Sequence, residues 1–466
     1  MPVDRGAGLV GERTTTPRVM TQQGCDLHHA AMAVRRPGLW HNGDFLRLWG
    51  GESVSRLGSQ VSLIAIPFAA VVLLHVSAFQ AGLLGTAEYL PWLLIGLPAG
   101  VIVDRLPRRS VLIAADVGRA VVFASVPAAW WIGHLMLAQL YAVAFVAGIL
   151  TVFFEVAYQS YLPELVETEQ LVEGNSNLET TSSAASVAGP ALGGALIAGV
   201  GAAVSVLADA VSYVVSVAML VSIRGREQPL HDAEAPGASL LRGMRGDIVE
   251  GLRFLFGHPL LRPIVFCSAA ANLFLDMVLA LVVLFAVRDL GMSSTAVGLA
   301  FSVGSLALLA GAAGAPRIAT RIGTGPTIAG SATLFTLGFA LLALTPRAHP
   351  FWFIAAQSGI TGFAAVVYNV NQRSLRQAVT PSRLLGRVNA SNRFVVYGVS
   401  PVGTFVGGIL GSALGLRTTF WIAAGGLALP ALLVMYSPVM RLRSIEDVSP
   451  FSAAAEEVRV APPMPG

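Results

Sequence analysis

The chain has 466 residues, of which 55% are hydrophobic and only 12% are charged, and its mean hydropathy is +0.69. A soluble domain usually carries about twice that charged fraction, so the composition excludes an ordinary soluble enzyme or binding domain. The formal net charge of +4 does not indicate a nucleic-acid partner, because the basic residues fall in the gaps between apolar runs. These runs recur from Phe45 onward, and each is long enough to cross a hydrocarbon core about 30 Å thick. The sequence therefore predicts an all-α membrane protein with many spans.

The basic residues exclude several kinds of chemistry. All thirty are arginine, because the chain contains no lysine. A Walker A loop needs a lysine against the nucleotide phosphates, and a Schiff base with pyridoxal phosphate or retinal needs an amine. The two cysteines, Cys25 and Cys267, and the eight histidines show no metal-ligand spacing. We therefore expect no nucleotide, cofactor, metal or catalytic site, and no enzyme.

Twelve spans can be drawn along the chain, six in each half. Residues 1–44 precede them and are polar, without a periodic apolar pattern or a signal peptide, so we expect a disordered cytoplasmic leader. Residues 45–223 and 263–440 form the two predicted six-helix bundles, with a polar cytoplasmic segment at 224–262 between them and a polar cytoplasmic tail at 441–466. The predicted spans are Phe45–Leu74, Gln80–Val103, Ser110–Ile132, Leu135–Tyr158, Thr181–Val200, Ala203–Ile223, Pro263–Val287, Thr295–Ala315, Gly325–Thr345, Phe351–Val370, Phe394–Leu414 and Thr418–Val439.

The placement of arginine predicts the orientation of these spans, because positively charged residues concentrate in cytoplasmic loops. With the N-terminus inside, only Arg288, Arg347 and Arg417 fall in the loops on the outer side. We therefore expect a multi-pass protein of the cytoplasmic membrane with both termini in the cytoplasm.

The two halves also share a sequence pattern. Tyr158-Gln159-Ser160 is followed by Asn175 in the first half, and Asn371-Gln372-Arg373 is followed by Asn389 in the second. The offset is about 214 residues, close to half of the membrane region. This spacing predicts a duplicated six-span unit.

The loop between the second and third spans carries the most specific motif. It reads Gly100-Val101-Ile102-Val103-Asp104-Arg105-Leu106-Pro107-Arg108-Arg109. The pattern G-x-x-x-D-R-x-x-R-R resembles the signature loop between spans 2 and 3 of the major facilitator superfamily. The resemblance implies two parallel six-helix repeats with a binding site at their interface.

The same resemblance implies a gating role for the loop. The acid, Asp104, is expected near the N-terminal end of span 11, where unpaired N–H groups favour an anion. The arginines Arg105, Arg108 and Arg109 are expected to bridge to other cytoplasmic helix ends. Such a latch would hold the inner gate shut in one conformation and release it in the other. The alternative interpretation is a solvated basic turn.

A glycine-rich motif lies in the fifth span, Gly189-Pro190-Ala191-Leu192-Gly193-Gly194. Proline removes one intrahelical hydrogen bond, and glycines four residues apart let another backbone approach closely. The motif resembles the span-5 motif of drug/proton antiporters, which implies export. Ordinary tight helix packing is the alternative.

Further motifs resemble a bacterial subgroup of this superfamily. They are Phe45-Leu46-Arg47-Leu48-Trp49, Gly251-Leu252-Arg253-Phe254-Leu255-x-x-His258-Pro259 and Tyr161-Leu162-Pro163-Glu164-Leu165-Val166. The subgroup includes enterobactin-type siderophore exporters, macrolide-efflux-type proteins and proteins named transmembrane secretion effectors. Many drug/proton antiporters carry an arginine in span 4, but Leu135–Tyr158 contains none. Proton coupling therefore uses carboxylates elsewhere, or the protein is not driven by protons.

Polar residues within the spans are candidates for function, because charge is costly inside hydrocarbon. Glu52, Arg56 and Gln60 recur every four residues and share one helix face. The resemblance implies that spans 1, 4, 7 and 10 line a central cavity. The candidates for proton or substrate binding are Glu52, Arg56, Gln60, Glu88, Glu155, Asn272, Asp276 and Gln357.

Three of these acids are ranked for proton coupling. Asp276 and Glu88 come first, because they lie near the middle of their spans, and Glu52 follows. Asp116 and Arg119, three residues apart in the third span, are expected to form a structural ion pair.

The sequence thus predicts a secondary active exporter of a small molecule of the drug, antibiotic or siderophore class. We expect alternating access and proton-coupled antiport by a monomer, with the substrate, protons and the lipid bilayer as its partners and with no nucleic acid. Two alternatives stay open: uptake or facilitated transport of a metabolite, and a non-transporting membrane subunit of a secretion or envelope complex.

Overall fold

The computed structural model describes residues 39–167, 170–224 and 237–444, and within these ranges helix is the only regular secondary structure. Most of the predicted leader (1–44) and tail (441–466) therefore lies outside the described residues. The long helices are α2 (Gly43–Val72), α3 (Ala78–Val103), α4 (Arg108–Trp131), α5 (Leu137–Leu165), α6 (Leu171–Val200), α7 (Ala202–Ser222), α8 (Gly237–Gly257), α9 (Leu261–Leu284), α10 (Ser294–Ile322), α11 (Thr324–Ala343), α12 (Pro350–Val379), α13 (Leu385–Gly398), α14 (Ser400–Leu414) and α15 (Leu416–Met435).

Eleven helical segments of the described chain are long and apolar enough to cross a membrane, which confirms an all-α protein with many spans. One of them joins α13 and α14 as Leu385–Leu414. These two helices are separate because Pro401, at the start of α14, has no N–H to continue the α13 ladder. The 26-residue helix α3, which coincides with the second predicted span, is not among the eleven. A total of twelve spans stays a prediction.

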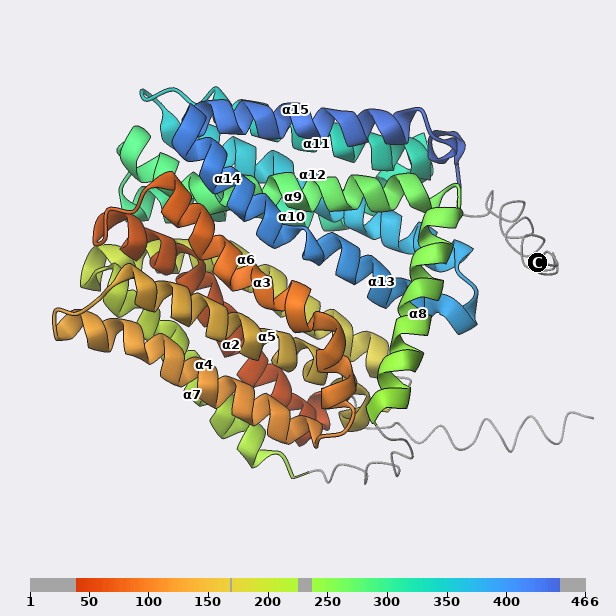
Figure 1. Cartoon of the computed structure of the whole chain (residues 1–466), viewed down its shortest axis with the longest axis horizontal. Helices are drawn as coiled ribbons and strands as arrows, with labels where there is room; N and C mark the ends of the chain where they lie inside the picture. Colours follow the sequence, from red (N-terminus) through yellow and green to blue (C-terminus); the bar gives the residue numbers. More distant parts are fainter. Residues whose placement is uncertain (1–38, 168–169, 225–236, 445–466) are drawn as a thin grey trace, which may run out of the picture.

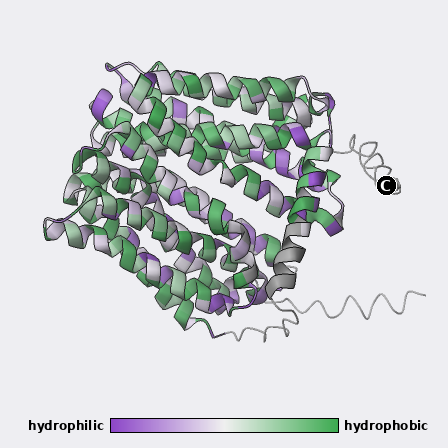
Figure 2. Cartoon of the chain, in the orientation of Figure 1, coloured by the Kyte–Doolittle hydropathy of each residue, from purple (hydrophilic) through white to green (hydrophobic). Residues whose placement is uncertain are grey.

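The helices of the two halves lie in two groups (Figure 1). In the first half, α2 packs on α6 and α7, and α5 packs on α3 and α4. In the second half, α12 packs on α10 and α11, and α9 packs on α14 and α15. The groups meet where α3 packs on α14 and where α6 packs on α10. Figure 2 shows that hydrophobic residues predominate along the long helices of both groups, with hydrophilic residues near helix ends and at some positions within the bundle.

The two ends of the helices differ in charge. We call the end that carries the 104–107 loop and α8 the arginine-rich end. At the opposite end, two arginines bind carbonyl groups at or next to helix ends. Arg417 donates from Nη1 and Nη2 to the carbonyls of Ala343 and Thr345, at 2.9 and 2.6 Å, and Arg347 Nε donates to the Asp289 carbonyl at 3.0 Å.

The segment at 224–262, to which the sequence analysis assigned no helix, contains α8. This helix runs across the ends of both groups (Figure 1). It docks on α13, where Arg387 forms an ion pair with Glu250 and the Ser391 hydroxyl donates to the Ile248 carbonyl at 3.3 Å.

Candidate functional site

A cavity of about 540 Å³ lies between the two groups of helices, and both groups contribute to its walls. Seven of the eight candidate residues line it: Glu52, Arg56, Gln60, Glu88, Glu155, Asp276 and Gln357. The exception is Asn272, which does not line the cavity and donates from Nδ2 to the Ser268 carbonyl of its own helix at 3.0 Å. Pockets of about 300–1,000 Å³ accommodate drug-sized ligands, so the cavity has room for one such molecule.

One wall carries a charged network centred on Arg56. Its Nε donates to Glu52 at 2.5 Å, and its Nη2 donates to Glu155 at 2.8 Å. Glu52 and Arg56 lie on α2, whereas Glu155 lies on α5. The spacing of Glu52 and Arg56 indicated their contact, but nothing in the sequence indicated that Glu155 joins them. A single guanidinium group thus holds two carboxylates.

Asp116 and Arg119 form an ion pair on α4. Asp116 is 0% exposed and Arg119 is 5% exposed. The guanidinium group of Arg119 lies 4.1 Å from the ring centroid of Phe154 and 4.4 Å from that of Tyr213. Arg119 therefore links α4 to α5 and α7 from within a buried site.

Asp209 is a cavity residue that the sequence analysis did not select. It lies on α7, is fully buried, and accepts hydrogen bonds from the hydroxyls of Ser59 at 3.3 Å and Ser212 at 3.2 Å. The expectation that spans 1, 4, 7 and 10 line the cavity excluded it. An isolated acid in an apolar span was the available signal.

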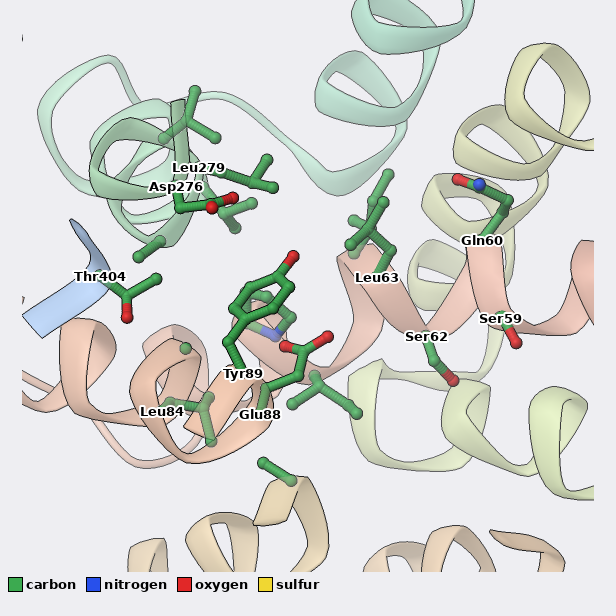
Figure 3. A pocket seen from close by; sticks show the side chains of 18 of the residues that line it. Ser59, Gln60, Ser62, Leu63, Leu84, Glu88, Tyr89, Asp276, Leu279 and Thr404 are labelled. Atoms are coloured by element: carbon green, nitrogen blue, oxygen red, sulfur yellow. The ribbon is translucent and has the colours of Figure 1, made fainter. Parts of the chain in front are cut away.

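Glu88 and Asp276 differ from Glu52 and Glu155 because no ion pair of the described residues includes either of them, a feature that they share with Asp209. Glu88 lies on α3 in the first half, and Asp276 lies on α9 in the second. Figure 3 shows both side chains and Tyr89 extending into the same space, with Leu63 and Leu279 nearby. The two unpaired carboxyl groups thus face one cavity from opposite halves.

A second hollow of about 330 Å³ adjoins the cavity toward the arginine-rich end, and Trp92 lines both. There α3 of the first half contacts α13 of the second. The rings of Trp92 on α3 and Tyr397 on α13 lie 5.6 Å apart, and Arg393 Nη1 donates to Gln159 Oε1 at 3.1 Å.

At the opposite end the two halves are in close backbone contact. A Cβ atom added to Gly194 of α6 would lie 2.5 Å from the Ser294 carbonyl oxygen of α10, and one added to Gly82 of α3 would lie 2.5 Å from the Gly408 Cα of α14. The Thr86 and Thr404 hydroxyls meet at 3.0 Å across the second contact. Glycine is required at these positions because no side chain fits.

The glycine-rich motif of the fifth span accounts for one of these contacts. Gly189 and Gly193 face Gln60 and Val61 of α2, whereas Pro190 and Gly194 face α10. Next to them, the Ala191 N–H donates to the Ser302 hydroxyl of α10 at 2.8 Å. The motif thus packs one face of α6 against α2 of its own half and the adjacent face of α6 against α10 of the other half.

Only part of the loop motif contacts other helices. The motif consists of Gly100, Asp104, Arg105, Arg108 and Arg109. Arg108 pairs with Glu164 of α5, and Arg109 donates from Nε and Nη2 to the Leu220 and Val221 carbonyls at the end of α7, at 2.9 and 2.7 Å. Asp104 ends α3 and is exposed, and none of the hydrogen bonds or ion pairs of the described residues includes its carboxylate.

A bundle of membrane-length helices with a ligand-sized cavity between its halves is the arrangement expected of a membrane transporter. The Major Facilitator Superfamily matches the chain over residues 48–395 and 264–459. The chain belongs to this superfamily and is a transporter rather than an enzyme.

Its relatives include exporters. The chain is 30% identical over 408 residues to the multidrug efflux pump Tap of Mycolicibacterium fortuitum, covering 84% of this chain and 94% of that protein. It is 25% identical over 393 residues to the enterobactin exporter EntS of Citrobacter koseri, covering 82% and 89%. Its fold is similar to that of a bacterial homologue of the iron transporter ferroportin in an inward-facing state, with a TM-score of 0.68, 16% identity and coverage of 86% and 99%.

Proposed function

We propose that this protein is a secondary active exporter of small organic molecules of the drug, antibiotic or siderophore class, working by alternating access and proton-coupled antiport. The observation that carries the proposal is the ligand-sized cavity that Glu88 and Asp276 enter from opposite halves without a cationic partner. The names of the relatives, a multidrug efflux pump and an enterobactin exporter, support export as the direction.

The proposal includes a topology. The helices α2–α7 form one six-span unit, and α9–α15, with α13 and α14 as one span, form the other. The arginine-rich end faces the cytoplasm, together with both termini and α8. The close contacts of α3 with α14 and of α6 with α10 then shut the outer end, and substrate enters from the cytoplasm past Trp92 and Tyr397.

We assign proton coupling to carboxyl groups that can gain or lose a proton without breaking an ion pair. Glu52 and Glu155 are held by Arg56, so a change in their protonation would break an ion pair. Glu88 and Asp276 have no such partner and can bind a proton on one side of the membrane and release it on the other. Antiport then requires only that substrate and proton occupy these groups in turn.

The test is drug accumulation in inside-out vesicles with and without a proton gradient. We expect Asp276→Asn and Glu88→Gln each to abolish accumulation against a gradient while downhill exchange continues, because both changes keep shape and hydrogen bonding and remove titration. Glu173→Gln is the matched control, since Glu173 is exposed and does not line the cavity. Uphill accumulation by both variants would exclude this coupling site and make Glu52 the next residue to test.

A separate prediction concerns the loop motif. We expect Asp104→Asn to slow transport several-fold and to leave substrate affinity unchanged. The exposed carboxylate has no partner in this conformation, and the attraction of an anion to a helix N-terminus, about 0.3–2 kcal/mol, would be lost only when the arginine-rich end closes. Such a change shifts a balanced two-state equilibrium. Initial rates and binding constants measured on the same preparation separate the two effects, and a wild-type rate would contradict the latch.

A further inference from the structure

The charge of the cavity is strongly unbalanced. Five acids line it (Glu52, Glu88, Glu155, Asp209 and Asp276), against two arginines (Arg56 and Arg119). Their full ionisation leaves a formal charge of −3 on the lining. Arg119 is moreover paired with Asp116, just behind the wall. In a low-dielectric site, such an excess attracts cations and excludes anions.

The excess charge can be located. Arg56 binds both Glu52 and Glu155, and Asp209 accepts hydrogen bonds from serine hydroxyls. Arg56 thus offsets one of its two carboxylate charges, and the serine hydroxyls leave the charge of Asp209 in place, so Glu88 and Asp276 together carry the largest share of the excess, two negative charges. Asp276 is 5% exposed, has the buried Ser400 hydroxyl beside it, and makes no ion pair with any described residue. Its carboxylate points into the cavity (Figure 3).

The walls around these two acids are apolar and aromatic. Leu63 is 43% exposed and Leu279 is 38% exposed, and both line the cavity (Figure 3). Tyr89 and Trp92 follow Glu88 on α3 and line the same cavity. Aromatic faces attract cations, and exposed leucines bind apolar groups. The site therefore combines an unpaired negative charge with a surface for hydrophobic rings.

We propose that the cavity binds lipophilic organic cations, with the positive charge between Glu88 and Asp276 and the apolar groups against Tyr89, Trp92, Leu63 and Leu279. This rests on the proposed export function and names the substrate class for the same cavity. Because the two acids lie on α3 and α9, the bound cation attracts both halves of the protein at once.

Two probes of matched shape and opposite charge test the inference: tetraphenylphosphonium and tetraphenylborate. Equilibrium dialysis against the full-length protein in lipid nanodiscs, with empty nanodiscs subtracted, measures binding of each. We expect tetraphenylphosphonium to bind and tetraphenylborate to bind no more than to empty discs. Loss of one charged partner weakens binding about tenfold to a hundredfold, so Glu88→Gln and Asp276→Asn should each have that effect, and the double variant should remove binding.

The control variant Glu173→Gln should bind tetraphenylphosphonium as the wild type does, and size-exclusion profiles verify that all variants are folded. Equal binding of the two probes, or wild-type affinity in the double variant, overturns the inference. The proposed function fails separately. If the protein exports a neutral drug but does not bind tetraphenylphosphonium, the exporter function holds and the cation site is wrong. If it binds tetraphenylphosphonium but transports no drug, the cation site holds and the exporter function is wrong.

Discussion

Replacing Gly194 by valine should lower the transport rate by about fivefold to a hundredfold. Gly194 of α6 lies against α10, where even a Cβ atom would be 2.5 Å from the Ser294 carbonyl oxygen and 3.2 Å from the Gly298 Cα. These are backbone atoms, so the helices must separate to make room. Overpacking of this kind costs about 1–3 kcal/mol, and it penalises only the conformation in which this end is closed. The variant should therefore remain open at this end.

The same helix provides the control. Gly199 lies five residues further along α6, and nothing lies within 4 Å of a Cβ atom added there, so Gly199→Val should transport normally. Conformation can be read from a single cysteine at the cavity residue Ser305, in a background without Cys25 and Cys267. An impermeant maleimide applied outside should label it faster in Gly194→Val. Transport by Gly194→Val at the wild-type rate would show that this contact does not have to close.

Replacing Arg119 by methionine should cause the largest loss of stability. Asp116 is fully buried, and its ion pair with Arg119 is the one that compensates its charge. Removing one partner of a buried pair costs about 3–5 kcal/mol. The contacts of the guanidinium group with the rings of Phe154 and Tyr213 are lost as well. Thermal unfolding in detergent, followed by circular dichroism, measures the effect.

A second substitution separates charge from packing. Asp116→Asn removes the buried charge, so the double variant Asp116→Asn/Arg119→Met should regain much of the lost stability. Arg383→Met, at an exposed position of the arginine-rich end, is the control for loss of an arginine and should unfold as the wild type does. If the double variant is no more stable than Arg119→Met, the buried charge is not the cause.

A helix end could be predicted from the sequence where a particular residue, such as a glycine, stops the helix. An end without such a residue was missed. The predicted span Thr181–Val200 ends where α6 ends, because Gly201 adopts a φ of 86°, which favours glycine. Its start is wrong by ten residues, since α6 begins at Leu171. The stretch from 171 to 180 is rich in polar residues, and hydropathy cannot distinguish a polar helix from a polar loop.

The contacts in the site were likewise predictable in part. Contacts within one helix followed from spacing, as for Glu52 with Arg56 and for Asp116 with Arg119. Contacts between helices did not, because Glu155 reaches Arg56 from 99 residues away. Glu88 and Asp276 were selected by their charge in apolar spans, but their meeting in one cavity depends on how the two halves pack.

The two ends of the bundle should respond differently to ionic strength. Backbone contacts and hydroxyl groups join the halves at the Gly194 end, so its opening breaks none of the ion pairs of the described residues and should depend little on salt. At the arginine-rich end, Arg393 of the second half donates a hydrogen bond to the neutral Gln159 of the first, and the ion pair of Arg387 with Glu250 holds α8 against α13. Salt screens such exposed charges over about 8–10 Å. Added salt should therefore loosen the arginine-rich end more than the Gly194 end. Under the proposed topology, the ionic composition of the cytoplasm would then be one of the variables that set how readily this protein opens to that side.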